Sequence, residues 1–202
     1  MNSTSSPDKP IENIDPIVEI AVNNCKNVPE ARRPDALKIA EKIYKIERRF
    51  NVPKSLKGMV LAAACAESGF NPNALGDRKF SKDKRTPKAV GILQLWPWWE
   101  RGRWGYKINR RDPEQSAYAW MKHIAKQIPS VRRRCKPRTS KLLWIQAWVQ
   151  AIRAPKPSGR CRERPKHIRY LRKFHRILKK RNADRLRTQN MKSDDAQIEK
   201  TR

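Results

Sequence analysis

One glutamate, Glu67, stands where it could exchange a proton with a substrate. It continues the helical face of a preceding run of apolar residues, which are spaced as Leu56, Met59, Val60, Ala63 and Ala64. Gly69 and Pro72 indicate that the helix ends just after Glu67, where the helix dipole disfavours a carboxylate. Burial and the dipole should both raise its pKa, as a general acid for glycosidic cleavage requires. The alternative is an ordinary glutamate at a frayed helix end.

A second motif, Gly91-Ile92-Leu93-Gln94, follows Glu67-Ser68-Gly69-Phe70-Asn71-Pro72 after a polar loop. The two motifs, in this order and at this distance, resemble the soluble lytic transglycosylases, relatives of goose-type lysozyme that cleave peptidoglycan. The resemblance covers roughly residues 38 to 178. It implies a mainly α, lysozyme-like helical domain in which Glu67 is the catalytic acid and base, Ser68 steadies the substrate, and Gln94 hydrogen-bonds a sugar.

The side chains of the second motif suit a ligand. Gly91 would allow backbone to approach a substrate, and the Gln94 amide can donate to and accept from an N-acetyl group. The alternative for Gln94 is a loop amide bonded to backbone. Tyr170 resembles a family tyrosine that points toward the cleft, although a half-buried tyrosine on an amphipathic helix is an equal reading. The family's Ala-Tyr-Asn-Ala-Gly segment is absent, because this chain has Ala147-Trp148-Val149-Gln150-Ala151 there.

Aromatic residues crowd the segment after Gln94, namely Trp96, Trp98, Trp99, Trp104 and Tyr106. Indole faces stack on sugar rings, and their N–H groups bond hydroxyls, so the cluster suits a glycan groove. We expect one or two of these rings, Trp96 among them, to face the cleft and the rest to fill the core.

The mechanism depends on a second carboxylate. A two-carboxylate hydrolase needs one about 5 to 9 Å from the acid. The resemblance implies instead that Glu67 alone acts as acid and then base, and that the product is a 1,6-anhydro-N-acetylmuramic acid. Asp77, early in the loop between the motifs, is the residue that could convert the enzyme to a hydrolytic muramidase. No cofactor is expected, and the three histidines match no metal-ligand spacing.

The charge points to a polyanionic partner, because 48 Lys and Arg face 19 Asp and Glu, a net charge of +29. Basic runs such as Arg132-Arg133-Arg134 and Lys179-Lys180-Arg181 would also suit a nucleic-acid or virion binding protein without catalysis. The same charge would hold an enzyme on an anionic envelope, and the Glu67 motif favours catalysis. No signal peptide or transmembrane helix is visible in the first thirty residues, so action at the bacterial cell wall or periplasm would need another export route or a phage origin.

The positioning elements are predicted to be helices. We expect a lead with a short helix over residues 1–34, the lysozyme-like domain over 35–180, and a charged tail over 181–202. Residues 73–90 lack a helical stripe and should form a loop or short hairpin at the cleft rim. Four cysteines are too few to define a disulfide framework, although Cys135 and Cys161 flank one helix and could pair in an oxidising compartment. The predicted helices lie near residues 16–21, 35–50, 55–67, 113–128, 140–152 and 168–178.

Overall fold

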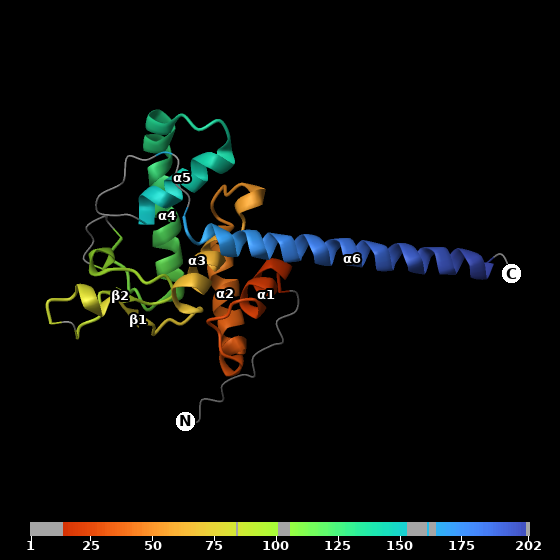
Figure 1. Cartoon of the computed structure of the whole chain (residues 1–202), viewed down its shortest axis with the longest axis horizontal. Helices are drawn as coiled ribbons and strands as arrows, with labels where there is room; N and C mark the ends of the chain where they lie inside the picture. The colour runs from red at the N-terminus through yellow and green to blue at the C-terminus, as the bar shows by residue number, and fades with distance from the viewer. Residues whose placement is uncertain (1–13, 84, 101–105, 153–160, 162–164, 201–202) are drawn as a thin grey trace, which may run out of the picture.

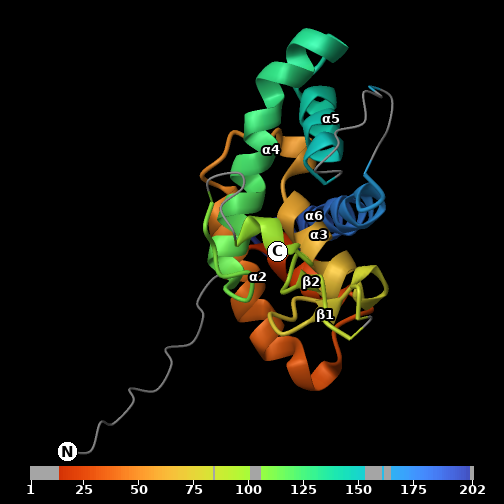
Figure 2. The same ribbon diagram turned by 90° about the vertical axis from the view of Figure 1, so that its left-hand side faces the viewer.

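The fold is mainly helical, as expected, with one small hairpin (Figures 1 and 2). The computed structural model describes residues 14–83, 85–100, 106–152, 161 and 165–200, with the backbone alone for 185–200. The helices are α1 (Pro16–Asn23), α2 (Arg33–Glu47), α3 (Met59–Ser68), α4 (Pro113–Cys135), α5 (Ser140–Ile152) and α6 (Ile168–Lys200). The strands are β1 (Leu75–Gly76) and β2 (Ala89–Val90), and short 3-10 turns span Glu30–Arg32, Lys54–Leu56, Arg78–Phe80 and Pro97–Trp99.

Helix α3, which ends in the Glu67 motif, lies at the centre of the fold and contacts α1, α2 and α6. All of its residues from Met59 to Cys65 are buried, so it has no solvent face. The predicted helix from Ser55 with one apolar stripe is therefore wrong. Gly58 adopts a φ of 86°, which interrupts the helical backbone between Leu56 and Met59 and leaves Leu56 in a separate 3-10 turn.

A buried carboxylate caps the start of α3. Glu47, the last residue of α2, is 1% exposed, and its two oxygens accept from the backbone N–H groups of Gly58 (2.5 Å) and Val60 (2.8 Å). These N–H groups belong to the first turn of α3, where a helix has no internal acceptors. Glu47 thus joins the end of α2 to the helix that carries Glu67.

The short helix α1, assigned from sequence to a lead ahead of the domain, packs in the same core as α2, α3 and α6. Its start was foreseen, since the Asp15 side chain accepts from the N–H of Ile17. The Cys25–Cys65 disulfide, which the sequence did not indicate, joins the segment after α1 to α3. A second disulfide, Cys135–Cys161, joins the two cysteines that flank α5, a pairing that the sequence left open.

The rim between the two motifs is a short antiparallel hairpin, as the lack of a helical stripe predicted. Leu75 pairs with Val90 and Gly76 with Ala89. The guanidinium of Arg110 is buried and donates to the carbonyl oxygens of Lys88 (2.8 Å) and Leu95 (2.7 Å). These bonds fasten the hairpin to the segment that leads into α4.

The C-terminal helix differs from expectation. We predicted its end near Lys179, but α6 continues to Lys200 and extends beyond the rest of the molecule in Figure 1. Its first turns are packed, with Leu171 and Phe174 buried against the core, whereas Lys179, Lys180 and Arg181 are exposed. Within the described part of the chain, none of the helices combines the length and the apolar character that a membrane crossing needs.

Candidate active site

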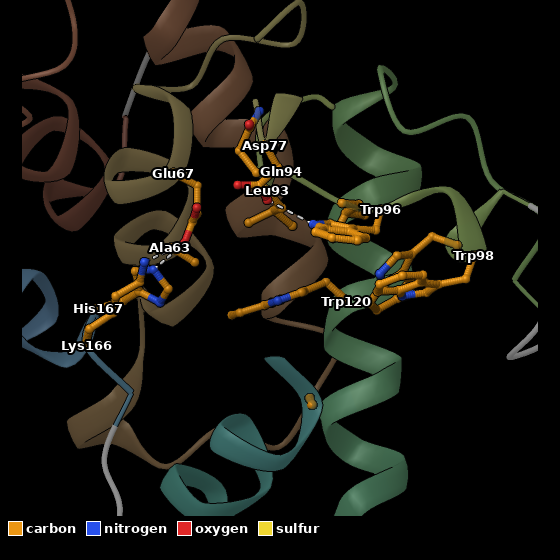
Figure 3. A pocket seen from close by; sticks show the side chains of 13 residues that line it. Ala63, Glu67, Asp77, Leu93, Gln94, Trp96, Trp98, Trp120, Lys166 and His167 are labelled. Carbon is orange, nitrogen blue, oxygen red and sulfur yellow. Dashed lines mark hydrogen bonds and ion pairs between the residues drawn. The ribbon is translucent and has the colours of Figure 1, made fainter. Parts of the chain in front are cut away.

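A cleft of about 590 Å³ opens between α3, the rim hairpin, α4 and the chain just before α6 (Figure 3). It brings Glu67 together with Gln94, Asp77 and several indole rings. Two of its lining residues are small, Ala63 from α3 and Ala151 from α5. The lining residues are Ala63, Glu67, Asp77, Leu93, Gln94, Leu95, Trp96, Trp98, Trp99, Trp120, Ala151, Lys166 and His167.

Glu67 is paired with two basic side chains. Its Oε1 lies 2.5 Å from Nε2 of His167 and 3.8 Å from Nζ of Lys166, and its side chain is 27% exposed. Burial acts to raise the pKa of Glu67, but the hydrogen bond from His167, the charge of His167 and the charge of Lys166 outweigh it and hold the pKa below the ordinary value of 4.5. The expected rise in pKa is therefore wrong for this conformation. The sequence indicated burial and the helix dipole, but no local pattern indicated the two basic side chains.

His167 is a residue of the cleft that the sequence did not indicate. It lies 100 residues after Glu67, in the turn that begins α6, and it is only 4% exposed. Its ring stacks on Trp148 of α5, with centroids 6.1 Å apart and an interplanar angle of 17°. No local motif marks His167, because only the packing of α6 on α3 brings it to the glutamate.

Gln94 lines the cleft, but its amide is used largely within the protein. Its Nε2 donates to the carbonyl oxygens of Ala74 (3.1 Å) and Gly91 (2.9 Å). The N–H groups of Gln94 are therefore bonded to backbone, as in the alternative that the sequence left open. A Cβ on Gly76 would collide with Oε1 of Gln94, so the glycine in β1 makes room for this side chain. Gln94 is thus held rigidly at the rim, with a φ of 48°.

Ser68 and Gly91 join the two motifs rather than lining the cleft. The Ser68 hydroxyl lies 2.9 Å from the carbonyl oxygen of Ile92, to which it can donate, and it accepts from the N–H of Asn71 at 3.1 Å. Gly91 has a φ of 80°, and a Cβ there would collide with the carbonyl oxygen of Arg110. The close backbone approach that we expected at Gly91 is therefore to the protein's own chain and not to a ligand.

Asp77 and Trp96 face the cleft as a hydrogen-bonded pair. The indole Nε1 of Trp96 donates to Oδ2 of Asp77 at 2.9 Å, and Trp98 lies against Trp96 with centroids 4.8 Å apart. One oxygen of the candidate second carboxylate is thus already engaged. Trp99 is buried among core residues although it borders the cleft, and Trp104 lies outside the described residues.

Tyr170 is not among the residues that line the cleft. It is half-buried on the first turns of α6, and the guanidinium of Arg169 lies 5.1 Å from its ring centroid. The amphipathic-helix reading of Tyr170 fits this position. His167, three residues earlier, takes the place beside Glu67.

Among the described residues, no group of three or more His, Cys, Asp or Glu side chains could hold a metal ion. In comparisons with models of known protein families, with curated proteins and with solved structures, the chain matches none. The geometry of the cleft and the two sequence motifs are therefore the basis for a function.

Proposed function

We propose that the protein is a peptidoglycan lytic transglycosylase with a lysozyme-like domain, and that Glu67 is its catalytic acid and base. The observation that carries the proposal is a carboxylate at the end of a helix whose preceding turns are buried, facing a cleft of about 590 Å³ lined by indole rings. Indole faces suit sugar rings, and a partly buried carboxyl suits proton transfer to a glycosidic oxygen.

The reaction needs one proton and no water. Glu67 gives its proton to the oxygen that links N-acetylmuramic acid to N-acetylglucosamine, and the C1–O bond breaks to leave an oxocarbenium centre. The Glu67 carboxylate then removes the proton from the C6 hydroxyl of the same sugar, and O6 bonds to C1. The products are a free hydroxyl on one fragment and a 1,6-anhydro ring on the other.

The paired glutamate must be protonated before the first step. Nε2 of His167 lies 2.5 Å from Oε1 of Glu67, so a proton on this nitrogen makes the pair charged, and its transfer along the contact gives a neutral imidazole and a neutral carboxyl group. A bound glycan would exclude water from the cleft, which disfavours the charged pair relative to the neutral one. His167 therefore serves in the proposal as the proton partner of Glu67.

A hydrolytic muramidase is the second candidate, because Asp77 lines the same cleft as Glu67. A base that activates water needs an oxygen free to accept its proton. Oδ2 of Asp77 accepts from Trp96, which favours a role in holding that indole over a role as base. We therefore place transglycosylation first.

The net charge of +29 fits an enzyme that is concentrated on an anionic bacterial envelope. A basic protein that only binds nucleic acid or a virion would gain nothing from a glutamate paired with a buried histidine in a cleft. We therefore keep peptidoglycan strands as the partner. The proposed place of action is the bacterial cell wall or periplasm.

The proposal is tested by clearing of purified sacculi with wild type, Glu67→Gln and Glu114→Gln. Glutamine keeps the shape of Glu67 but carries no transferable proton, so clearing should fall by about 10²–10⁴-fold. Glu114 is an exposed glutamate in the first turn of α4, outside the cleft, and its variant should match wild type. Activity of Glu67→Gln within about tenfold of wild type would remove Glu67 from the mechanism.

A further inference from the structure

An aromatic row lies at the rim of the cleft. Phe80, in the 3-10 turn between the two strands, is 56% exposed and lies beside Trp96 with ring centroids 5.7 Å apart. Trp96 in turn lies 4.8 Å from Trp98, and neighbouring rings in the row are tilted by 43° and 33°. The three rings therefore form one continuous apolar surface.

The aromatic row extends from the cleft to the surface outside it. Trp96 and Trp98 line the cleft, as Figure 3 shows, whereas Phe80 is not among its lining residues. The Trp96 ring is fixed by its bond to Asp77, whose own backbone adopts a φ of 57°. Because Phe80 is exposed, its ring does not contribute to the core. Exposed apolar patches commonly mark binding sites.

We propose that Phe80, Trp96 and Trp98 form a stacking subsite for a further sugar ring of a β-1,4-linked N-acetylhexosamine chain, beyond the linkage at Glu67. The proposal rests on the proposed function, since it names how the same cleft holds a long glycan. The C–H face of a pyranose is apolar and packs on aromatic rings, while its hydroxyl and amide groups remain at the edges. Asp77, at the edge of the row, offers a carboxylate acceptor to such groups.

A single-stranded nucleic acid would also stack on aromatic rings, and the chain is strongly basic. The row is less suited to it, because Asp77 contacts Trp96 directly and Glu67 lies in the same cleft. A phosphate backbone following the row would meet these two carboxylates. Lys79, whose Nζ lies 5.0 Å from the Phe80 ring centroid, is the cation beside the row.

The test measures calorimetric binding of the N-acetylglucosamine trimer and hexamer to the full chain carrying Glu67→Gln, which prevents turnover. Adding Phe80→Ala should weaken hexamer binding by about tenfold and leave trimer binding unchanged, because only the longer chain reaches Phe80. Phe80 is exposed, so the substitution leaves the core intact. Tyr118→Ala, which removes another exposed aromatic ring located on α4, is the matched control and should change neither affinity.

Three results would each overturn the subsite. Phe80→Ala could weaken trimer and hexamer binding equally, it could leave hexamer binding unchanged, or the hexamer could fail to bind even with Phe80 in place. If Phe80→Ala weakens binding of an oligo-dT probe and leaves both sugar oligomers unaffected, the row is a nucleic-acid site instead. Failure of the proposed function is distinct from these results, since it appears as wild-type protein that releases no fragments from sacculi.

Discussion

The two ends of α3 each meet a glutamate, and the two carboxyl groups are held in opposite ways. At the start, Glu47 is fully buried and accepts only from backbone N–H groups, and burial raises its pKa to about 7. At the end, Glu67 is partly exposed to a cleft and paired with His167 and Lys166, which lower its pKa despite the opposing effect of burial.

The helix dipole alone would give the reverse order, because it favours a carboxylate at the start of a helix and disfavours one at the end. Desolvation decides the pKa at Glu47, and two nearby cations decide it at Glu67. The difference separates a structural carboxyl group from one that can exchange its proton with a ligand. Substitutions at one end of α3 can therefore be compared with substitutions at the other.

Removing the carboxyl at the start of α3 should have the largest effect on stability. Glu47→Ala leaves the N–H groups of Gly58 and Val60 buried without acceptors, which should cost about 2–4 kcal/mol in the free energy of unfolding. Urea unfolding measures this cost. Glu67→Gln is the matched change at the other end, where the side chain is partly exposed, and it should lower stability by less than about 1 kcal/mol. Equal costs at both ends would contradict the comparison.

The pH dependence of stability should identify Glu47. Its pKa rises from an ordinary 4.5 to about 7 in the folded state, so its contribution is fully present below pH 4.5 and is lost as the pH rises to about 7. The difference in unfolding free energy between wild type and Glu47→Gln should shrink over this range by up to about 3 kcal/mol. A difference that stays constant with pH would show that Glu47 is charged throughout.

At the other end of α3, the pH dependence of activity should respond to His167. In the proposal the Glu67–His167 pair supplies the proton, so kcat/KM falls as the pH rises and the pair loses that proton. In His167→Gln the Glu67 carboxyl must hold the proton alone, and a carboxyl releases a proton at lower pH than an imidazole, so the falling limb should move to lower pH. Lys166→Gln removes a positive charge that favours release of the proton, so it should move the limb to higher pH. His175→Gln, on α6 and outside the cleft, should not move it; a limb unchanged in His167→Gln would exclude the pairing from the mechanism.

Local sequence signals predicted much of the fold. Helix starts near residues 16 and 113 were predicted, and there the side chains of Asp15 and Asp112 accept backbone N–H groups. The lack of a helical stripe in residues 73–90 marked the hairpin. The start of α3 was misplaced because Gly58 breaks a run whose apolar spacing continues across it. The packing of α1 into the core was also missed, since it depends on contacts with α3 and α6 that no local pattern contains.

The site was predictable only where the two motifs and the segments next to them form it. Glu67, Gln94, Asp77 and Trp96 do line one cleft. The ligand roles of Ser68 and Gly91 were inferred from their positions in the motifs. In the structure, the Ser68 hydroxyl lies against the carbonyl oxygen of Ile92, and Gly91 lies against the carbonyl oxygen of Arg110. Both contacts join segments that are far apart in sequence. His167 could not be found from spacing, because its contact with Glu67 spans 100 residues.

The most direct test of the single-glutamate mechanism is mass spectrometry of the fragments released from sacculi by wild type and by Asp77→Asn. Trapping of C1 by the C6 hydroxyl gives fragments that end in 1,6-anhydro-N-acetylmuramic acid, lighter by one water than the hydrolysed sugar and without a reducing end. We predict anhydro ends from both proteins, because the proposed mechanism uses Glu67 alone and Asp77 accepts a hydrogen bond from Trp96. Reducing ends from wild type that disappear in Asp77→Asn would contradict the mechanism and make Asp77 the second carboxylate of a muramidase.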